Sequence, residues 1–486
     1  MRPAGLTVTI RLTSVLLTTV LSGCMVGPDY VPPHTALEPF HNLDAVKRGQ
    51  AALPAPQIDR WWDGFNDPIL VTVVQRALGQ NLDLAASLAR VAQARAAARY
   101  AGAQLLPTLD ADASAAARRQ SLKSSIGSLS KSFPGFDRNQ SEYTVGSSAS
   151  WEIDVFGGVR RGASAASAEF EAAQADQVGT RITVAADAAD AYLQIRGYQA
   201  RLQMAQAQVD TGARLLSLVQ ARHQAGQVDG REVAQAEALY SQARATMQPL
   251  RIALEAQLNR LDVLMGAQPG SYAQELAQPT EIPAIPAIGG PDTPLDVLRR
   301  RPDVIAAERR LASSNERIGV AISDYYPKMS LSAALGFDSL SANHLLAGSA
   351  FQATGGGALR WRLFDFGKVE AEVAQARGAN AEALAQYRQT VLKAAEDVEN
   401  ALVALSQTQA HVVELQAEVD SLVRARDLSE RAYKAGSITL TEVLDAERQL
   451  LAARDELAAN RADAARSAVG IFRALGGGWV VPKIGP

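Results

Sequence analysis

The nine residues WEIDVFGGV at positions 151–159 return as WRLFDFGKV at positions 361–369. Trp, Phe, Gly and Val match at an offset of 210 residues, and the same offset relates Gly226 to Gly436. An offset that persists well beyond two short stretches indicates duplication rather than a chance match. The chain is therefore expected to consist largely of two copies of one unit.

Upstream of these stretches the offset is 220 residues, since Asp83 matches Asp303 and Pro107 matches Pro327. The additional ten residues of the first copy must follow Pro107. Positions 121–138 are rich in Ser, Gly and Lys and have the composition of a loop that tolerates insertion.

We expect the copies to span 61–268 and 299–479, joined by a Pro-rich extended linker at 269–298 and followed by a tail at 480–486. A unit of about 200 residues is too long for a solenoid repeat, which has a period of roughly 20 to 50 residues. The chain should instead have an internal two-fold repeat.

Each copy contains two stretches in which apolar and polar side chains alternate, as in an amphipathic β-strand. They cover about 108–118 and 142–154 in the first copy and about 328–338 and 350–364 in the second. Strands of this length can cross a bilayer when tilted. Alternation alone fits equally well two amphipathic hairpins on a soluble core. If the strands do cross a membrane, four are too few to close a barrel, so several chains must share one.

Very long helices are expected after each strand pair, because no proline occurs within 135–248 or within 328–481. Continuous helices over 158–226 and 367–436 would each be about 100 Å long, and the glycine at each end favours a turn into a returning helix. Pro249 is expected to kink or restart the first returning helix.

Apolar residues recur every seven positions in the second long helix, the spacing of a left-handed coiled coil. They are Leu384, Val391, Val398, Leu405, Val412 and Val419. Two helical hairpins per chain are thus predicted to pack as coiled coils.

The N-terminus has the features of an export signal. Arg2 and Arg11 precede the apolar stretch 12–21, which is shorter than the ~20 residues that a membrane-spanning helix needs. Residues 1–23 are therefore expected to be a signal peptide.

The sequence Leu21-Ser22-Gly23-Cys24 resembles the bacterial lipobox, in which the cysteine is lipidated and begins the mature chain. The alternative is a buried cysteine that happens to lie there. Met25, rather than Asp, follows the cysteine, which by resemblance to lipoprotein sorting rules implies the outer membrane. Residues 24–60 then form a lipidated, extended N-terminal segment.

Catalytic, metal and nucleic-acid sites find little support. The formal net charge of −3 gives no electrostatic reason to bind nucleic acid, and one cysteine provides neither an internal disulfide nor a cysteine metal cluster. Ser128-Leu-Ser-Lys131 has the serine-x-x-lysine spacing of penicillin-recognising enzymes but lacks their companion motifs. Gly355 to Gly357 lacks the Lys-Ser/Thr of a phosphate loop, and on a strand favours close backbone approach or curvature. The histidines lack the i, i+4 spacing of a metalloprotease helix: His34, His41, His223, His344 and His411. We expect no catalytic residue, cofactor or metal.

Several motifs in a fixed order resemble those of a known family. They are WWDGFNDP at 61–68, RRRPDV at 299–304, LDAE at 444–447 and LGGGW at 475–479. With the lipobox they resemble the outer-membrane factor family, the TolC-like exit ducts of tripartite efflux pumps. GPDY at 27–30 is similar to the NodT-type lipoprotein branch of that family.

The resemblance implies an α+β membrane protein that is a homotrimer. Four strands from each chain would form one twelve-stranded transmembrane β-barrel, continued by a long periplasmic α-helical coiled-coil barrel. It also implies three kinds of partner: a periplasmic adaptor (membrane fusion protein), an inner-membrane pump of the resistance-nodulation-division type, and outer-membrane lipid. Reasoning from the residues gives four strands, two helical hairpins and oligomerisation, whereas the number three comes from the family.

Two sets of side chains are candidates for functional positions. Trp151 and Trp361 share the parity of the apolar residues, which places both on the lipid face near one interface. The resemblance supplies a periplasmic gate, in which Asp445 of each chain faces the aperture. Arg448 is spaced to form an i, i+3 pair with it, and Thr441 departs from the bulky apolar residue that relatives often place near this constriction. The alternative is an ordinary solvated Asp–Arg pair.

We therefore expect a lipid-anchored outer-membrane channel that passively exports drugs or other small toxic molecules. A wide duct imposes little chemical selection, so specificity should reside in the pump. Two alternatives stay open: a pore-less periplasmic coiled-coil scaffold lipoprotein, which conductance would distinguish, and an outer-membrane-anchored hydrolase, which turnover would reveal.

Overall fold

The computed structural model describes residues 25–33, 38–43, 54–130, 135, 137–288, 297 and 300–480. The expected signal peptide, Cys24, much of the linker's second half and nearly all of the C-terminal tail lie outside these residues. The chain divides into two compact units. Unit 1 draws on Met1–Pro33, Ala92–Glu171 and Glu308–Ala385, and unit 2 on His34–Val91, Ala172–Ala307 and Gln386–Pro486.

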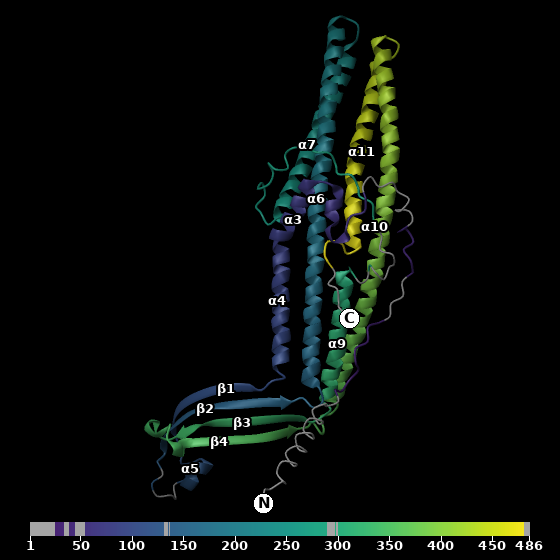
Figure 1. The fold of residues 1–486 in the computed structure, drawn as a ribbon. Helices are drawn as coiled ribbons and strands as arrows, with labels where there is room; N and C mark the ends of the chain where they lie inside the picture. The colour runs from purple at the N-terminus through teal and green to yellow at the C-terminus, as the bar shows by residue number, and fades with distance from the viewer. Residues whose placement is uncertain are drawn as a thin grey trace, which may run out of the picture. The chain divides into compact units, whose positions relative to one another are not determined.

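Unit 1 contains one four-stranded antiparallel sheet with the strands in chain order (Figure 1). Its strands are β1 Thr108–Arg119, β2 Asn139–Ile153, β3 Lys328–Ser339 and β4 Phe351–Arg360. The β1–β2 and β3–β4 hairpins are joined because β2 pairs with β3. The range expected for the last strand, 350–364, is too long, since β4 ends at Arg360 and Trp361 lies beyond it.

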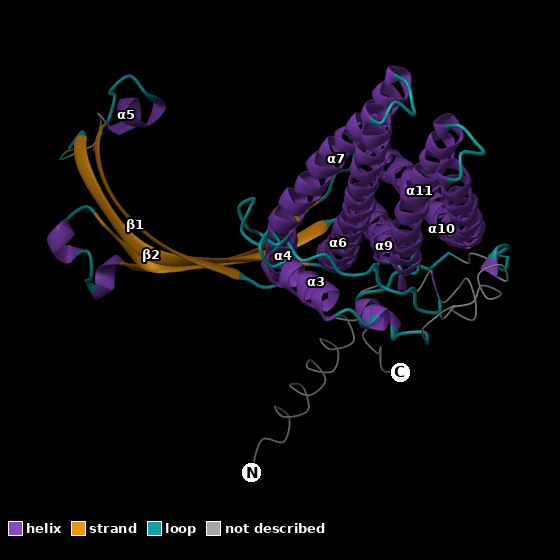
Figure 2. Cartoon of the chain, turned by 90° about the horizontal axis from the view of Figure 1, so that it is seen from above, coloured by secondary structure: helices purple, strands orange, loops and turns teal. Residues whose placement is uncertain are grey.

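The segment expected to be a loop, 121–138, contains the short helix α5, Ser125–Ser130. Two three-residue 3₁₀ turns, η2 Ala342–His344 and η3 Gly348–Ala350, connect β3 to β4. Figure 2 shows that the strands are strongly curved. Three consecutive glycines in β4, at 355–357, favour such curvature because glycine allows a strand to bend tightly.

The helices form pairs of equal length. The long helices α6, Gly158–Gln224, and α10, Lys368–Lys434, have 67 residues each. The returning helices α7, Gly230–Leu264, and α11, Leu440–Ala474, have 35 each. In Figures 1 and 2 each long helix lies beside its returning helix. Preceding the sheet hairpins are α4, Leu82–Ala103, and α9, Pro302–Ser323, with 22 residues each.

Pro249 was expected to kink or restart the returning helix, and α7 continues through it without a restart. A kink at Pro249 stays a prediction. Met247 and Leu250 on either side are buried in a cluster with Ala205 and Val209 of α6. This packing holds the helix together although proline removes one backbone hydrogen bond.

Heptad residues of α10 form part of the interior of unit 2. Val391, Val398 and Leu405 are buried. Farther along, Leu415 and Val419 form a cluster with Leu450, Ala453 and Leu457 of α11. The seven-residue spacing therefore corresponds to the face that packs on a neighbouring helix.

The main core of unit 2 is built around aromatic residues from both ends of the chain. The 3₁₀ segment η1, Ile58–Phe65, supplies Trp61, which is fully buried and stacks on Phe472 of α11 with ring centroids 5.4 Å apart. Helix α3, Pro68–Gln80, follows, with Asp67 accepting hydrogen bonds from its first backbone N–H groups. Trp61 and its neighbours in η1 therefore pack directly on α11, near the C-terminal end of the described chain.

Candidate functional site

The sheet of unit 1 has one apolar and one polar face. Paired residues have the same parity across all three seams, as in Trp151 with Leu331 and Leu331 with Gly357, so odd-numbered residues share a face. That face carries Leu109, Val145, Trp151, Leu331, Leu335, Phe337, Phe351 and Leu359, whereas the even face carries Asp110, Asp112, Glu142, Glu152, Lys328, Asp338, Arg360 and many Ser and Thr.

The apolar face is not covered by the described part of the chain. Leu335 is 58% exposed, Leu359 60% and Leu109 75%. A continuous apolar surface of this kind is unfavourable in water but suits the hydrocarbon region of a membrane. The outer edges of β1 and β4 also have no strand partner among the residues that the structure describes.

The two candidate tryptophans make equivalent hydrogen bonds. The indole N–H of Trp151 donates to the carbonyl of Leu105, and that of Trp361 donates to Tyr325, both over 2.9 Å. Each acceptor lies two residues before a proline that precedes a strand. Trp361 is exposed and Trp151 is partly buried. An indole whose N–H is satisfied suits a membrane interface, where one end of the side chain is apolar and the other is wet.

The segment that follows Cys24 is held against α6 and α9. The Val26 N–H donates to the Phe156 carbonyl over 3.1 Å, and a side chain on Gly27 would lie only 2.6 Å from the Gly319 Cα. Gly27 also has φ +96°, a conformation that favours glycine. We call residues 25–30 the N-terminal strap.

Arg161 of α6 fastens the strap. Its side chain is 2% exposed and forms ion pairs of 3.0 Å with Glu316 and 2.8 Å with Asp29, besides donating to the Val26 and Gly27 carbonyls. Burial alone would lower the pKa of Arg161, but the hydrogen bonds and charges of the two carboxylates raise it. Sequence reasoning missed this residue because its partners are far away along the chain.

Further ion pairs follow the same contact between α6 and α9. Arg317 pairs with Glu169 over 3.2 Å, and Arg309 with Glu171 over 3.1 Å. The two helices are thus joined by several charged contacts.

The turns of both helical hairpins begin at glycines with left-handed φ, +67° at Gly226 and +76° at Gly436. Each turn closes with a backbone bond typical of a helix C-terminus, from Gln227 to Arg222 and from Ser437 to Ala432. The hairpins are joined near these turns by an apolar cluster comprising Val219, Ala236, Leu239, Tyr433, Leu440, Val443 and Leu444. The Arg222 guanidinium lies 4.5 Å from the centre of the Tyr433 ring.

The candidate gate residues lie in the first turns of α11. Thr441 is exposed, and Asp445 and Arg448 have side chains 57% and 55% exposed. Asp445 is 3.6 Å from Arg448 and accepts a 2.8 Å hydrogen bond from Gln449. Within one chain, its carboxylate therefore has local partners.

Asp445 and Arg448 also border a hollow of about 630 Å³ between α6, α7 and α11. Arg201 of α6 forms a bidentate ion pair with Asp455 of α11, and both N–O distances are 2.8 Å. This pair connects the two hairpins close to the candidate gate.

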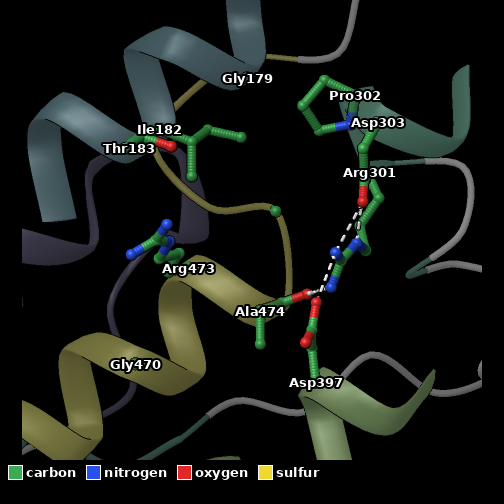
Figure 3. A pocket seen from close by; sticks show the side chains of 11 residues that line it. Gly179, Ile182, Thr183, Arg301, Pro302, Asp303, Asp397, Gly470, Arg473 and Ala474 are labelled. Atoms are coloured by element: carbon green, nitrogen blue, oxygen red, sulfur yellow. Dashed lines mark hydrogen bonds and ion pairs between the residues drawn. The ribbon is translucent and has the colours of Figure 1, made fainter. Parts of the chain in front are cut away.

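A second cavity, of about 450 Å³, contains a cluster of charges (Figure 3). Arg301 lies 2.7 Å from Asp303 and 2.8 Å from Asp397. It also donates to the carbonyls of Ala394 and Ala474. Burial opposes the charge, but these carboxylates outweigh it and raise the pKa of Arg301. Since its donors are occupied by protein groups, Arg301 joins chain segments and is not available for a ligand.

The other candidates are not brought together. Ser128 lies on α5, and Lys131 and His34 are outside the described residues. His223 contacts the Val228 carbonyl, and His411 lies 3.5 Å from Glu456. Among the described residues, no group of three or more His, Cys, Asp or Glu side chains could hold a metal. No helix in the described part of the chain is long and apolar enough to cross a bilayer.

Comparison with known proteins identifies relatives over most of the chain. The model of the outer membrane efflux protein family matches residues 73–267 and 294–477. The pyoverdine export outer membrane protein OpmQ of Pseudomonas aeruginosa is 32% identical over 87% of this chain and 88% of its own length. Nodulation protein T of Rhizobium leguminosarum bv. trifolii is 30% identical over 92% of this chain and 93% of its own length. The solved outer-membrane channel OprN superposes with a TM-score of 0.84 at 32% identity, covering 94% of this chain and all of its own.

Proposed function

Because the chain belongs to the outer membrane efflux protein family, a family of transport proteins, we propose that three copies close one channel across the outer membrane. Small molecules delivered by an inner-membrane pump and a periplasmic adaptor would leave the cell through it. The apolar, uncovered face of the sheet carries this proposal, since it needs lipid. Four strands leave two open edges, which are unfavourable in lipid, whereas twelve strands can close.

Within such a barrel the even-numbered face would line the channel. Its side chains are charged or hydroxyl-bearing, which suits a water-filled lumen. The helices of unit 2 from three copies would form the periplasmic tunnel. The coiled-coil packing of α10 on α11 supports this arrangement, because it gives each copy a paired helical hairpin that can line one part of the tunnel wall.

The proposal includes an internal duplication, with copies at 61–268 and 299–479 joined by the linker at 269–298. The equal lengths of α6 and α10, of α7 and α11, and of α4 and α9 support it. The equivalent hydrogen bonds of Trp151 and Trp361 support it as well.

We place a lipid on Cys24 and the mature N-terminus at the same residue. The N-terminal strap supports this placement, because it fixes the chain directly after Cys24 to the unit that contains the sheet. Mass spectrometry of the mature protein should show an acylated Cys24 at the N-terminus. An unmodified Cys24 still joined to residues 1–23 in the membrane fraction would contradict it.

We also place the resting gate at Asp445, with Arg448 and Thr441 beside it. Three copies would bring three Asp445 carboxylates together, and their repulsion must be balanced by Arg448, by a cation or by packing. Asp445→Ala should raise conductance and abolish block by divalent cations.

A matched control is Asp463→Ala, which removes another i, i+3 ion pair from α11, with Arg466. It should leave conductance unchanged. If Asp445→Ala behaves like Asp463→Ala, the local ion pair with Arg448 accounts for Asp445 and the gate lies elsewhere.

The partners proposed are an adaptor and a pump of the resistance-nodulation-division type. The pump would choose the compound, because the channel's proposed lining offers many similar small polar groups rather than one shaped pocket. Chemical cross-linking in the cells that produce the protein, followed by mass spectrometry of the co-purified proteins, would identify both partners.

Planar-bilayer recording of the purified protein tests the function itself. We expect discrete conductance steps and a native mass of three chains. A monomer without conductance would instead support the pore-less scaffold lipoprotein.

A further inference from the structure

The two ends of the β1–β2 hairpin differ in how their basic residues are paired. At the end that adjoins α6, Arg160 lies 3.3 Å from Asp154. Four basic residues lie at the other end, next to the turn that joins the two strands: Arg118, Arg119, Lys123 and Arg138. Within the described part of the chain, none of the four has a carboxylate oxygen within 4.0 Å. These charges are thus without an anionic partner from the residues that the structure describes.

The turn that carries Lys123 is held by its own hydrogen bonds. The Gln120 N–H donates to the Arg138 carbonyl over 2.6 Å, which extends the strand ladder by one pair. The Ser124 hydroxyl donates to the Ser121 carbonyl over 2.8 Å. Lys123 is exposed between these two serines. The turn therefore presents its lysine on an ordered backbone.

The one acidic residue between positions 118 and 138, Asp137, has another role. Its carboxylate accepts a 2.9 Å hydrogen bond from the Asn139 N–H, as in an Asx-turn. It forms no ion pair with a described basic side chain. The basic residues at this end of the hairpin therefore keep their full positive charge.

Arg119 ends the apolar face of β1. On this strand every odd-numbered residue from Leu109 to Ala117 is apolar, and Arg119 is the next in the series. Ten residue steps separate Leu109 from Arg119, which is about 33 Å of extended strand. At a tilt of about 40° this span is about 25 Å high, which is the height of the apolar band of an outer-membrane barrel. Since Trp151 lies at the same end as Leu109, Arg119 reaches the opposite interface.

The corresponding end of the second hairpin is not basic. The offset of 220 residues converts Arg118 into Asp338 and Arg119 into Ser339. No Lys or Arg occurs from Asp338 to Phe351, the stretch that joins β3 to β4. Both hairpins form a regular antiparallel ladder without this difference mattering. The basic residues are therefore not needed for strand pairing.

We propose that Arg119 and Lys123 bind the phosphate groups of lipopolysaccharide, the glycolipid of the outer leaflet. This rests on the proposed channel, which places the helices in the periplasm and this turn at the outer surface. A guanidinium can donate two parallel hydrogen bonds to a phosphate, and an ammonium group adds a point charge. Both side chains are exposed, and Arg119 lies where the apolar face gives way to the headgroups. Arg118 and Arg138 lie on the even-numbered face, which would line the channel, and take no part.

Lipid A binding to the purified full-length protein in detergent tests the site, with native mass spectrometry as the measurement. Arg119→Gln should weaken binding of diphosphoryl lipid A about tenfold, because it removes a charge-assisted contact, and adding Lys123→Gln should weaken it further. Arg118→Gln is the matched control, because it removes the same charge from the neighbouring residue on the polar face. It should bind as the original protein does. Monophosphoryl lipid A should bind the original protein more weakly, and the double variant should not distinguish the two lipids.

Two outcomes would overturn the assignment while the protein still forms channels. If Arg118→Gln weakens binding as much as Arg119→Gln, net charge accounts for the binding and the position of Arg119 does not. If phosphatidylglycerol binds the original protein as tightly as lipid A does, the site takes any anionic lipid and not this glycolipid.

Conductance of the same preparations separates the site from the channel. A trimer that conducts and binds lipid A equally well with and without Arg119 would overturn the site alone. A monomer that neither conducts nor binds lipid A would overturn the proposed channel, and the site with it.

Discussion

The helical core of unit 2 and the sheet of unit 1 bury their apolar residues to very different extents. Trp61, Phe65 and Phe472 are at most 2% exposed, whereas Leu335 and Leu359 on the sheet are more than half exposed. The chain thus supplies its own packing partners for the core. For the sheet, the described part of the chain supplies only the strands, and under the proposed function its packing partners are lipid and further copies of the chain.

The largest difference should come from truncating a core aromatic residue. Trp61→Ala removes the stack on Phe472 and leaves a cavity, so the free energy of unfolding should fall by about 3–5 kcal/mol. Urea unfolding followed by far-UV circular dichroism measures it. Leu359→Ala, on the exposed apolar face of β4, should cost less than about 0.5 kcal/mol in the same assay. If both variants lost the same free energy of unfolding, the predicted contrast between the helical core and the sheet would be wrong.

A charge on the sheet should act only through the membrane. Leu331→Arg places a guanidinium on the apolar face and should weaken insertion by about 2–4 kcal/mol if the residue lies near the bilayer midplane. Trp151→Arg, near an interface, should cost at most about 2 kcal/mol. The fraction of assembled protein in lipid vesicles measures both. Ser332→Arg, next to Leu331 but on the polar face, is the matched control and should assemble normally.

A third prediction concerns pH and the core alone. The buried Tyr192 hydroxyl donates a 2.5 Å hydrogen bond to Asp67, and burial followed by this bond raises the pKa of Tyr192 to about 12. Above about pH 10 the unfolded chain loses the tyrosine proton first, so the free energy of unfolding should decline, by about 2–3 kcal/mol once pH 12 is passed.

Comparison with Tyr192→Phe isolates this effect from other groups that titrate at alkaline pH. At pH 8 the free energy of unfolding of the variant should be lower than that of the original protein, because Asp67 loses the hydrogen bond from Tyr192. Between pH 10 and 11.5 it should decline less. Parallel declines for the two proteins would show that Tyr192 does not contribute.

Local patterns in the sequence were sufficient for the elements but not for the contacts between them. Alternation located the strands to within a few residues, except that it continues past Arg360, where hydrogen bonding stops. Glycine marked the hairpin turns, since each turn begins at a residue with left-handed φ. Pro249 does not end the returning helix, because the packing of its neighbours outweighs a local preference.

Contacts between residues far apart in the sequence could not be predicted from local patterns. Arg161 meets Asp29 and Glu316 across 132 and 155 residues, and nothing near Arg161 indicates these partners. The pairing of β2 with β3 likewise joins the two hairpins of the sheet, which are far apart in the sequence. Arg301 lies in the RRRPDV stretch that suggested the family, but its contact with Asp397 follows only from the fold.

The N-terminal strap also sets how far a lipid on Cys24 could move. Only Met25 separates that residue from Val26, whose backbone is hydrogen-bonded to Phe156, and two residues of extended chain reach at most about 7 Å. An anchor with so short a linker cannot serve as a flexible tether that explores the membrane surface. It would instead hold the lipid at a fixed position relative to the sheet, so that the acyl chains and the sheet enter the bilayer in one orientation.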